Sequence, residues 1–336
     1  MKVLAITNMY PTSATPRAGT FVEQQVDGLR REGVAVEVLH LDRAGRGVLQ
    51  YGTTWSRLRE ELDRVRPDVV HVMCGGVMGW QVSRAPCPCA LVIAFCGTDL
   101  LGDRTGPPLL RMRAAVGVWC SRASVRRADH VVVKSAQMMA HVPRHYPKTQ
   151  VSIIPNGVDL TRFRPMDRVA CRQGLGWRSG CLHVVIAAHG PGDRNKRIPL
   201  AAAAVRLLAD RGLDAELHLM AKTPHPEVPV WLNAADVVVM TSHHEGSPNI
   251  VKEALACNRP VVSVDAGDVR ERLEGIRGCF IADANAADIA DKLVAVHAGP
   301  GQVEARDAMA QLSVERVAER LVGIYETAIA RSSTQR

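Results

Sequence analysis

The stretch "NAADVVVMTSHHEGSPNIVKEALACNRPVV", residues 233–262, decides the fold. Residues 236–241 form a short apolar run rich in valine, typical of a buried strand, and residues 260–264 form a second one. The apolar side chains between them recur at helical spacing: Ile250, Val251, Ala254 and Leu255. A strand, a helix and a strand in this order form a βαβ unit, whose strands run parallel. The stretch therefore predicts a parallel α/β sheet.

The same alternation runs along the whole chain. The strands expected in the first half are residues 3–7, 35–41, 68–73, 90–95, 130–134 and 151–154. Those expected in the second half are residues 183–188, 215–220, 236–241, 260–264 and 279–282. Helical patterns lie between them, among them residues 20–31 and 55–65.

A loop-rich stretch, residues 155–180, separates the two series of strands. We therefore predict two Rossmann-like domains, residues 1–163 and 164–313, and a helix at 314–336 that packs back toward the first domain. Ligands of open parallel sheets bind beyond the carboxyl ends of the strands. With two such domains, the expected site is the cleft between them.

Composition narrows the class of protein. The 336 residues, 47% hydrophobic and 23% charged, are typical of a globular protein with two cored domains. No apolar run reaches the roughly 18 residues of a membrane span, and the apolar start at residues 1–7 is too short for a signal-peptide core. The nine cysteines are scattered without a C-x-x-C pair, so we expect reduced thiols in a cytoplasmic protein and no zinc site.

The net charge of +8 favours an anionic partner such as a nucleotide, a nucleic acid or an acidic membrane. We do not expect nucleic acid to be the partner, because the chain has no basic stretch with interleaved aromatic residues.

Two glutamates, Glu245 and Glu253, flank the predicted helix start. Ser247 is typical of an N-cap and Pro248 of a first helical residue, so the backbone amides of residues 246–250 should be free to bind an anion. Two carboxylates around a phosphate-binding turn suit a phosphorylated ligand rich in hydroxyls. The alternative is a capped amphipathic helix with two solvated glutamates.

The segment "EGSPNIVKE", residues 245–253, fits the E-x7-E motif of the retaining glycosyltransferases of family 4, in the GT-B superfamily. Other stretches stand in the order that the family has them: "GTFVEQQVDGL", "PDVVHV", "FCGTDLLG", "ADHVVVKS", "IIPNGVDLTRFRP", "NKRIPLAAAAVRLL" and "NAADVVVMTSHHEGSPN". The similarity spans residues 3–293. The chain thus resembles this family, which implies the GT-B fold of two Rossmann-like domains facing across a cleft.

The resemblance also implies a role for each residue of the motif. Glu245 would contact hydroxyls of the donor sugar, and Glu253 would bind the ribose of the nucleotide. The residues that would line the sugar and the diphosphate are Gly246, Ser247, Pro248, Asn249 and Ile250.

The loop "HGPGDRNKR", residues 189–197, follows a predicted strand. In similar enzymes an arginine and a lysine of this loop hold the diphosphate, which implies these roles for Arg194 and Lys196. Fixed cations can neutralise a departing diphosphate where other enzymes use a metal ion. The alternative is a solvated basic turn. Gly19 stands where the family brings backbone close to the donor phosphates or the acceptor, and the alternative there is an ordinary loop glycine.

One position departs from the family. Many relatives have histidine before the glycine of "FCGTDLLG", close to the transferred sugar, and this chain has Cys96. A thiol of ordinary pKa cannot replace histidine in proton transfer at neutral pH. A retaining transfer without a covalent intermediate needs no side-chain base, because the departing phosphate can take the proton. Asp99 could cap the following segment or touch the acceptor.

The resemblance implies a metal-independent, retaining, hexosyltransferase-type enzyme that moves a sugar from a nucleotide-diphosphate sugar to a hydroxyl acceptor, without a cofactor or a metal. The alternative is a sugar-nucleotide epimerase or a sugar phosphorylase of the same fold. The short apolar start opposes a periplasmic-type receptor. A dinucleotide oxidoreductase is opposed by the lack of G-x-G-x-x-G after either first strand.

Residues 109–130 predict a helix with an apolar stripe and several arginines. The stripe is Leu109, Met112, Val116 and Trp119, and the arginines include Arg122, Arg126 and Arg127. Such a helix can dock on an anionic membrane, which would make the protein membrane-associated. We favour the other interpretation, in which the stripe covers the sheet and the arginines are solvated. We also expect a core position for His71 and no metal at His243 or His244.

Overall fold

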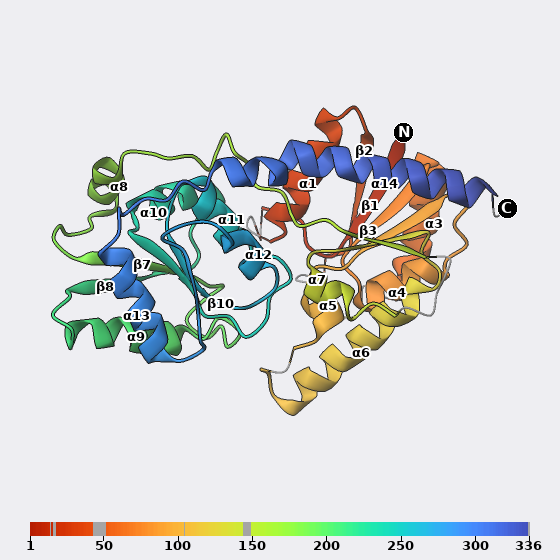
Figure 1. Ribbon diagram of the computed structural model, residues 1–336. Coiled ribbons are helices and arrows are strands. Elements are labelled where there is room, and N and C mark those ends of the chain that lie inside the picture. The colour runs from red at the N-terminus through yellow and green to blue at the C-terminus, as the bar shows by residue number, and fades with distance from the viewer. Residues whose placement is uncertain (14, 16–17, 43–51, 104, 144–148, 335–336) are drawn as a thin grey trace. The chain divides into compact units, whose positions relative to one another are not determined.

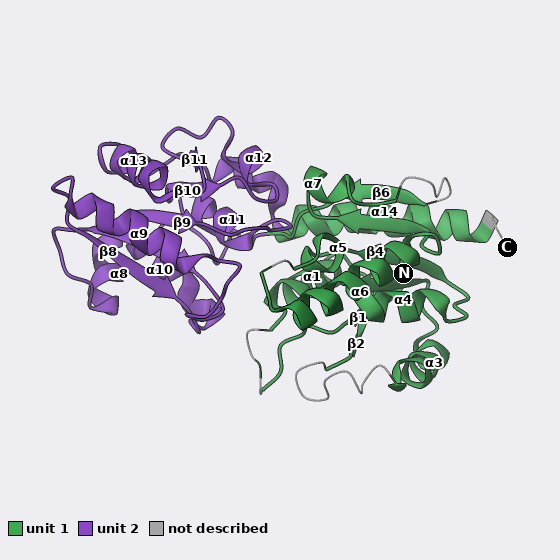
Figure 2. Cartoon of the chain, turned by 90° about the horizontal axis from the view of Figure 1, so that it is seen from below, with its two compact units in different colours: residues 1–157, 314–336 green, residues 158–313 purple. Residues whose placement is uncertain are grey.

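The computed structural model describes residues 1–13, 15, 18–42, 52–103, 105–143 and 149–334. The chain divides into two compact units, coloured green and purple in Figure 2. Unit 1 is Met1–Gly157 with Val314–Arg336, and unit 2 is Val158–Ser313. The chain thus leaves unit 1 a little before the boundary expected at 163 and returns to it at the one expected at 313. Val158 and Ser313 form a parallel β-bridge, so the two crossings lie side by side.

Unit 1 is built on a six-stranded parallel sheet with the order β2-β1-β3-β4-β5-β6. Its strands are β1 (Lys2–Thr7), β2 (Ala35–His40), β3 (Val69–Met73), β4 (Ala90–Ala94), β5 (His130–Val133) and β6 (Gln150–Ile153). Its helices are α1 (Thr20–Arg31), α3 (Thr54–Val65), α4 (Gly76–Arg84), α5 (Thr98–Leu101), α6 (Pro108–Val125), α7 (Ala136–Met139) and α14 (Val314–Thr334). The strand order changes direction between β1 and β3, the kind of position where parallel sheets open a ligand crevice.

Apolar side chains are buried on both faces of this sheet, because alternate residues of a strand point to opposite sides. Helices α1 and α14 pack together on one face, and α3, α4, α5 and α7 contribute to the cluster on the other. Helix α14 runs along unit 1 in Figure 1. The hydroxyl of its Tyr325 lies 2.6 Å from Nδ1 of His71 in β3. Burial lowers the pKa of His71 to about 3, so His71 is a neutral core residue, as expected.

Unit 2 is built on a five-stranded parallel sheet with the order β11-β10-β9-β7-β8. Its strands are β7 (Leu182–Ala187), β8 (Ala215–Met220), β9 (Val237–Met240), β10 (Val261–Val264) and β11 (Phe280–Ala282). Its helices are α8 (Arg168–Leu175), α9 (Ile198–Ala209), α10 (Val228–Ala234), α11 (Asn249–Ala256), α12 (Val269–Leu273), α13 (Ala286–His297) and the short η2 (His225–Glu227) and η3 (Asp307–Leu312). Both series of predicted strands and the α/β class are confirmed.

Helix α6 contradicts the favoured interpretation of its sequence. Its apolar stripe does not cover the sheet, because the side chains are 50–62% exposed: Leu109, Met112, Val116 and Trp119. The side chains that α6 buries are smaller and lie near its end: Cys120, Ser121, Ser124 and Val125. Figure 1 shows the first turns of α6 extending away from the rest of unit 1. The stripe revealed the helical period, but the sequence could not reveal that the helix is longer than the surface it packs on.

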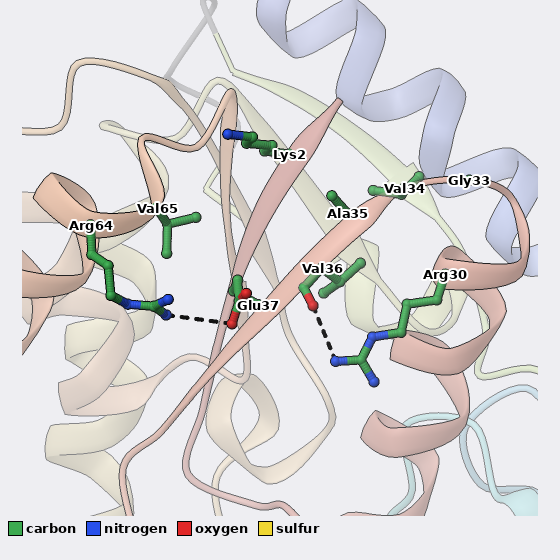
Figure 3. Close-up of a pocket in the computed structure, with 9 residues that line it drawn as sticks. All are labelled: Lys2, Arg30, Gly33, Val34, Ala35, Val36, Glu37, Arg64 and Val65. Atoms are coloured by element: carbon green, nitrogen blue, oxygen red, sulfur yellow. Dashed lines mark hydrogen bonds and ion pairs between the residues drawn. The ribbon is translucent and has the colours of Figure 1, made fainter.

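A pocket of about 580 Å³ lies in unit 1 where β1 and β2 begin, as Figure 3 shows. Two of its cationic side chains are already engaged. Arg64 forms an ion pair with Glu37 at 3.4 Å, and Arg30 donates to the carbonyl of Val36 at 3.1 Å. Ligands of parallel sheets bind at the opposite, carboxyl-terminal edge, so this pocket is not the candidate site. Among the described helices, none combines the length and apolarity of a membrane-spanning segment.

Candidate active site

The loops that follow β7 and β9 lie side by side at the carboxyl-terminal edge of unit 2, because these strands are neighbours. Asn195 joins the two loops. Its backbone carbonyl accepts the amide of His243 at 2.8 Å, and its side-chain amide donates to the carbonyl of His244 at 3.0 Å. The backbone and side chain of one residue thus hold the loop that leads to Glu245. The two histidines contribute backbone groups to this contact.

The three cations of the β7 loop have different environments. Arg197 donates to the carbonyl of Thr241 at the end of β9, so its guanidinium supports the loops. Nζ of Lys196 lies 2.6 Å from Oε1 of Glu245, and each side chain is 17% exposed. Arg194 is exposed, and no described residue pairs with its guanidinium. The structure therefore brings Lys196 and Glu245 together and leaves Arg194 open to solvent.

Helix α11 begins one residue later than the sequence predicted. Its N-cap is Pro248, with φ −68° and ψ 120°, and its first residue is Asn249. The hydroxyl of Ser247 instead donates to Asp268 and accepts from Lys252, both at 2.9 Å. The predicted serine cap is wrong because Asp268, which is distant in sequence, competes for this hydroxyl. Proline has no side-chain acceptor, so the N-cap residue of α11 makes no side-chain cap hydrogen bond.

Buried charges and a glycine support the turn before α11. Lys252 and Asp268 are 0% and 1% exposed, and both contact the hydroxyl of Ser247. Burial raises the pKa of Asp268, while the attraction of Lys252 opposes that shift. Gly267, at φ 68°, packs against the same turn, since a Cβ there would lie only 2.7 Å from the carbonyl oxygen of Gly246. The backbone around Glu245 is thus fixed by contacts from two segments.

Glu253 lies on α11 beside a histidine that the sequence analysis missed. Its Oε1 is 3.6 Å from Nε2 of His225, and the two side chains are 12% and 17% exposed. Nδ1 of His225 lies 2.6 Å from the guanidinium of Arg162, which can only donate. His225 therefore carries a proton on Nε2, toward Glu253. No local motif marks His225, because its proximity to Glu253 arises only through tertiary structure.

In unit 1, Gly19 lies between β1 and α1 with φ 70° and is the N-cap of α1. A Cβ at this position would lie 2.2 Å from the carbonyl oxygen of Met9. Close packing of the chain on itself therefore requires glycine here, independently of any ligand.

Asp99 joins the loops that follow β3 and β4. Its carboxylate accepts the amides of Gly75 at 2.7 Å, Gly97 at 2.8 Å and Cys96 at 3.0 Å. Asp99 lies in the first turn of α5, so its carboxylate holds the residues before this helix and does not cap a following segment. Cys96 itself contacts Cys74, with 3.0 Å between the two sulfurs.

Donor atoms suited to a metal also gather at the amino-terminal ends of β7 and β8, on the opposite edge of unit 2. Ligand atoms of Cys181, His183 and Glu216 lie within 4.8 Å of one another. The two nitrogens of His183 are engaged by the carbonyl of Arg178 at 2.9 Å and by His218 at 2.8 Å. Arg178 also pairs with Glu216. These side chains thus satisfy one another, away from the β7 and β9 loops.

The two units together have the GT-B fold. Solved structures similar to the chain include sucrose-phosphate synthase from Thermosynechococcus elongatus, with a TM-score of 0.79, 17% identity, and coverage of 98% of this chain and 100% of that one. They also include HepE of Anabaena in complex with UDP-glucose, with a TM-score of 0.64, 18% identity, and coverage of 97% and 100%. At these identities the similarity establishes the fold.

Two family models match successive parts of the chain. "Glycosyltransferase Family 4" matches residues 18–162, and "Glycosyl transferases group 1" matches residues 177–298. The chain belongs to family 4 of the GT-B glycosyltransferases.

Curated relatives include two proteins named D-inositol 3-phosphate glycosyltransferase. The one from Arthrobacter sp. strain FB24 is 25% identical over 277 residues, which are 73% of this chain and 65% of that protein. The one from Mycobacterium tuberculosis strain F11 is 28% identical over 312 residues, which are 80% and 63%. The chain spans about half to two thirds of the length of such relatives.

Proposed function

We propose that this chain transfers a sugar from a nucleotide-diphosphate sugar to a hydroxyl acceptor, with retention at the anomeric carbon and without a metal ion. The contact between Lys196 and Glu245, 2.6 Å long and largely buried at the carboxyl-terminal edge of unit 2, carries this proposal. Membership of the family supports it, as does the similar fold of HepE, which was solved with UDP-glucose. Because HepE was solved with UDP-glucose, we propose that the nucleotide of the donor is a uridine diphosphate.

In this proposal, Glu245 binds the sugar of the donor and Lys196 binds its diphosphate. Glu245 accepts hydrogen bonds from sugar hydroxyls, which replace the ammonium of Lys196. Lys196 then turns to the diphosphate, where Arg194 joins it from the same loop. A fixed cation near a departing diphosphate stabilises the charge that develops as the sugar bond breaks. The ion pair holds both side chains at the carboxyl-terminal edge of unit 2, where the donor binds in this proposal.

The diphosphate binds at the start of α11. The first turn of α11, which begins at Asn249, provides the positive end of the helix dipole for it. The turn from Gly246 to Pro248 lines the sugar and the phosphates with backbone. The hydrogen bonds of Ser247 with Lys252 and Asp268 hold this turn in place.

Glu253 accepts the ribose hydroxyls. A carboxylate that receives hydrogen bonds from neutral hydroxyls contributes about 1.5–3 kcal/mol to binding. The Nε2 proton of His225 points toward the same carboxylate and keeps it oriented.

In the reaction, the bond between the anomeric carbon and the diphosphate oxygen breaks, and the acceptor oxygen bonds to that carbon on the same face. The departing phosphate takes the acceptor proton, so no side-chain base is required. We assign acceptor binding to the loops of unit 1 that carry Gly19, Cys96 and Asp99, and we assign no proton transfer to Cys96. No cofactor takes part.

The test is product analysis by NMR after incubation with a panel of UDP-sugars and acceptors, one of which is inositol 3-phosphate. Transfer with an unchanged anomeric configuration, in the presence of EDTA, is the expected result. Conversion of the donor without an acceptor would indicate the epimerase alternative, and formation of a sugar phosphate would indicate the phosphorylase. Glu245→Ala should abolish transfer, while Glu304→Ala, at an exposed position of unit 2, serves as the matched control.

We also propose that the acceptor side works at an anionic membrane surface. Helix α6 exposes large apolar side chains and contains arginines but no aspartate or glutamate. Leu110 and Trp119 are 50% and 62% exposed, and Arg111 and Arg113 are exposed on the first two turns of α6. Apolar insertion together with cations binds acidic lipid, and each cation near the surface adds about 1 kcal/mol.

Co-sedimentation with vesicles tests this second proposal. The protein should bind phosphatidylglycerol vesicles and not phosphatidylcholine vesicles, and salt should weaken the binding. Arg111→Glu with Arg113→Glu, and separately Trp119→Ser, should release it. Val169→Ser, which removes an apolar side chain 63% exposed on unit 2, is the control. Absence of binding to anionic vesicles at low salt would instead point to an acceptor free in solution.

A further inference from the structure

Two cysteines meet at the carboxyl-terminal edge of the unit 1 sheet. Cys74 directly follows β3 and Cys96 lies just beyond β4, which is the neighbouring strand. Their sulfurs are 3.0 Å apart. A disulfide bond is about 2.05 Å long, so the sulfurs need to approach by roughly 1 Å to become bonded. Cys74 is buried, and Cys96 is partly exposed.

The backbone around this thiol pair is tied together by hydrogen bonds. The carboxylate of Asp99 accepts the amide of Gly75 at 2.7 Å and that of Cys96 at 3.0 Å. The hydroxyl of Ser121, on α6, accepts the amide of Gly76 at 2.7 Å and donates to the carbonyl of Asp99 at 2.7 Å. The turns that carry the two cysteines are therefore held in register, and the thiols stay in contact without a covalent link.

The electrostatic surroundings assign different chemistry to the two thiols. The hydrogen bond that Cys74 donates to Cys96, together with burial, raises the pKa of Cys74. Lys134, which follows β5 and is 2% exposed, lies near both thiols. Burial lowers the pKa of Lys134, and the attraction of the neighbouring Cys96, Cys74 and Asp99 opposes that shift. A thiolate is the form of cysteine that reacts with oxidants. Cys96 is the more accessible of the two thiols and lies near Lys134.

We propose that Cys74 and Cys96 are an oxidation site that forms a reversible disulfide with a peroxide-class oxidant. The thiolate of Cys96 attacks one peroxide oxygen, the O–O bond breaks, and Cys96 becomes a sulfenic acid while one water is released after protonation. The sulfur of Cys74 then attacks the sulfenic sulfur, the S–O bond breaks, and hydroxide leaves with the thiol proton as a second water. Two thiols lose two electrons in total, which reduce one hydrogen peroxide to two waters.

The consequence of this disulfide rests on the proposed function, which assigns acceptor binding to the loop that carries Cys96. Bond formation draws the Cys96 sulfur toward Cys74 and shifts the turn that Asp99 anchors. A displacement of about 1 Å near reacting groups can reduce turnover up to a hundredfold. Sugar transfer should therefore fall at least roughly tenfold on oxidation and recover on reduction with dithiothreitol.

Peptide mapping tests the site without any assumption about activity. The full chain is treated with hydrogen peroxide, its free thiols are alkylated, and the digest is analysed by mass spectrometry. The expected result is a peptide pair linked through Cys74 and Cys96 that separates on reduction. In Cys74→Ser, oxidation of Cys96 should continue from the sulfenic to the sulfinic acid, because the thiol that would form the disulfide is missing. Cys87→Ser is the matched control, since Cys87 contacts Cys89 at 2.7 Å elsewhere in unit 1 and its loss should not affect the link.

Alkylation of both Cys74 and Cys96 after peroxide treatment would overturn the proposal, because it would show that both thiols stay reduced. The proposal would also be overturned if Cys96 formed as much sulfinic acid in the unaltered chain as in Cys74→Ser. Transfer assays test the effect of the disulfide on turnover separately from the existence of the oxidation site. A linked pair with unchanged transfer would overturn the effect on turnover. Absence of transfer in the reduced chain would contradict the proposed function, while the map still decides whether the oxidation site exists.

Discussion

Gly267→Ala is a sharp test of the rigid turn that holds Glu245. The residue has φ 68°, and an added Cβ would lie 2.7 Å from the carbonyl oxygen of Gly246 and 3.1 Å from that of Glu245. Carbon and oxygen tolerate about 3.3 Å, so the turn has to move by roughly 0.6 Å. Since a shift of 1 Å can reduce turnover about a hundredfold, a loss of roughly tenfold or more is expected. The left-handed backbone alone should destabilise the chain by about 1–2 kcal/mol.

Gly275→Ala is the matched control for this prediction. Gly275 has φ 74° in the same unit, and no atom of the described residues lies within 4 Å of a Cβ there. Both variants therefore strain the backbone equally, and only Gly267→Ala displaces the turn. Urea unfolding measures the shared loss of stability, and titration calorimetry with the donor, together with turnover, measures the difference. Equal donor affinity and equal turnover in the two variants would refute the argument that the turn is fixed by this contact.

Other predictions concern the donor and the core. Glu253→Ala should weaken binding of free nucleotide by about 1.5–3 kcal/mol, measured by calorimetry, whereas Glu245→Ala should leave it nearly unchanged. Lys196→Ala should reduce turnover about a hundredfold, and the unaltered chain should keep its activity in EDTA; loss of activity restored by magnesium would contradict the metal-free mechanism. The pKa of His71, about 3 when folded, lies below the ordinary value of about 6.5, so unfolding releases a site that binds protons better. Stability is then full above about pH 6.5 and is lost as the pH falls, by about 2 kcal/mol at pH 5. Urea unfolding at pH 7 and 5 checks this, and His71→Gln should show a smaller difference between the two.

The sequence by itself determined the class of the fold and the central motif of the site. Strands buried on both faces must be short apolar runs, so their positions could be predicted to within one or two residues. Helix α1 has the predicted bounds, because its apolar stripe and the following Gly33 mark its length. Glu245 and Glu253 could be identified because their spacing and the turn between them lie within a single segment.

Only the tertiary structure decided which side chains meet. Lys196 contacts Glu245 because β7 and β9 are neighbours in the sheet, although β8 separates them along the chain. The partners of Ser247 and the approach of His225 to Glu253 likewise depend on strands and loops that are distant in sequence. The exposure of α6 also could not be predicted from the sequence. An amphipathic pattern gives the period of a helix but not how much of its length packs on the rest of the domain. Local patterns determine elements because helices and strands are local in their hydrogen bonds and periodicity, whereas contacts between elements depend on strand order and on the lengths of neighbouring elements.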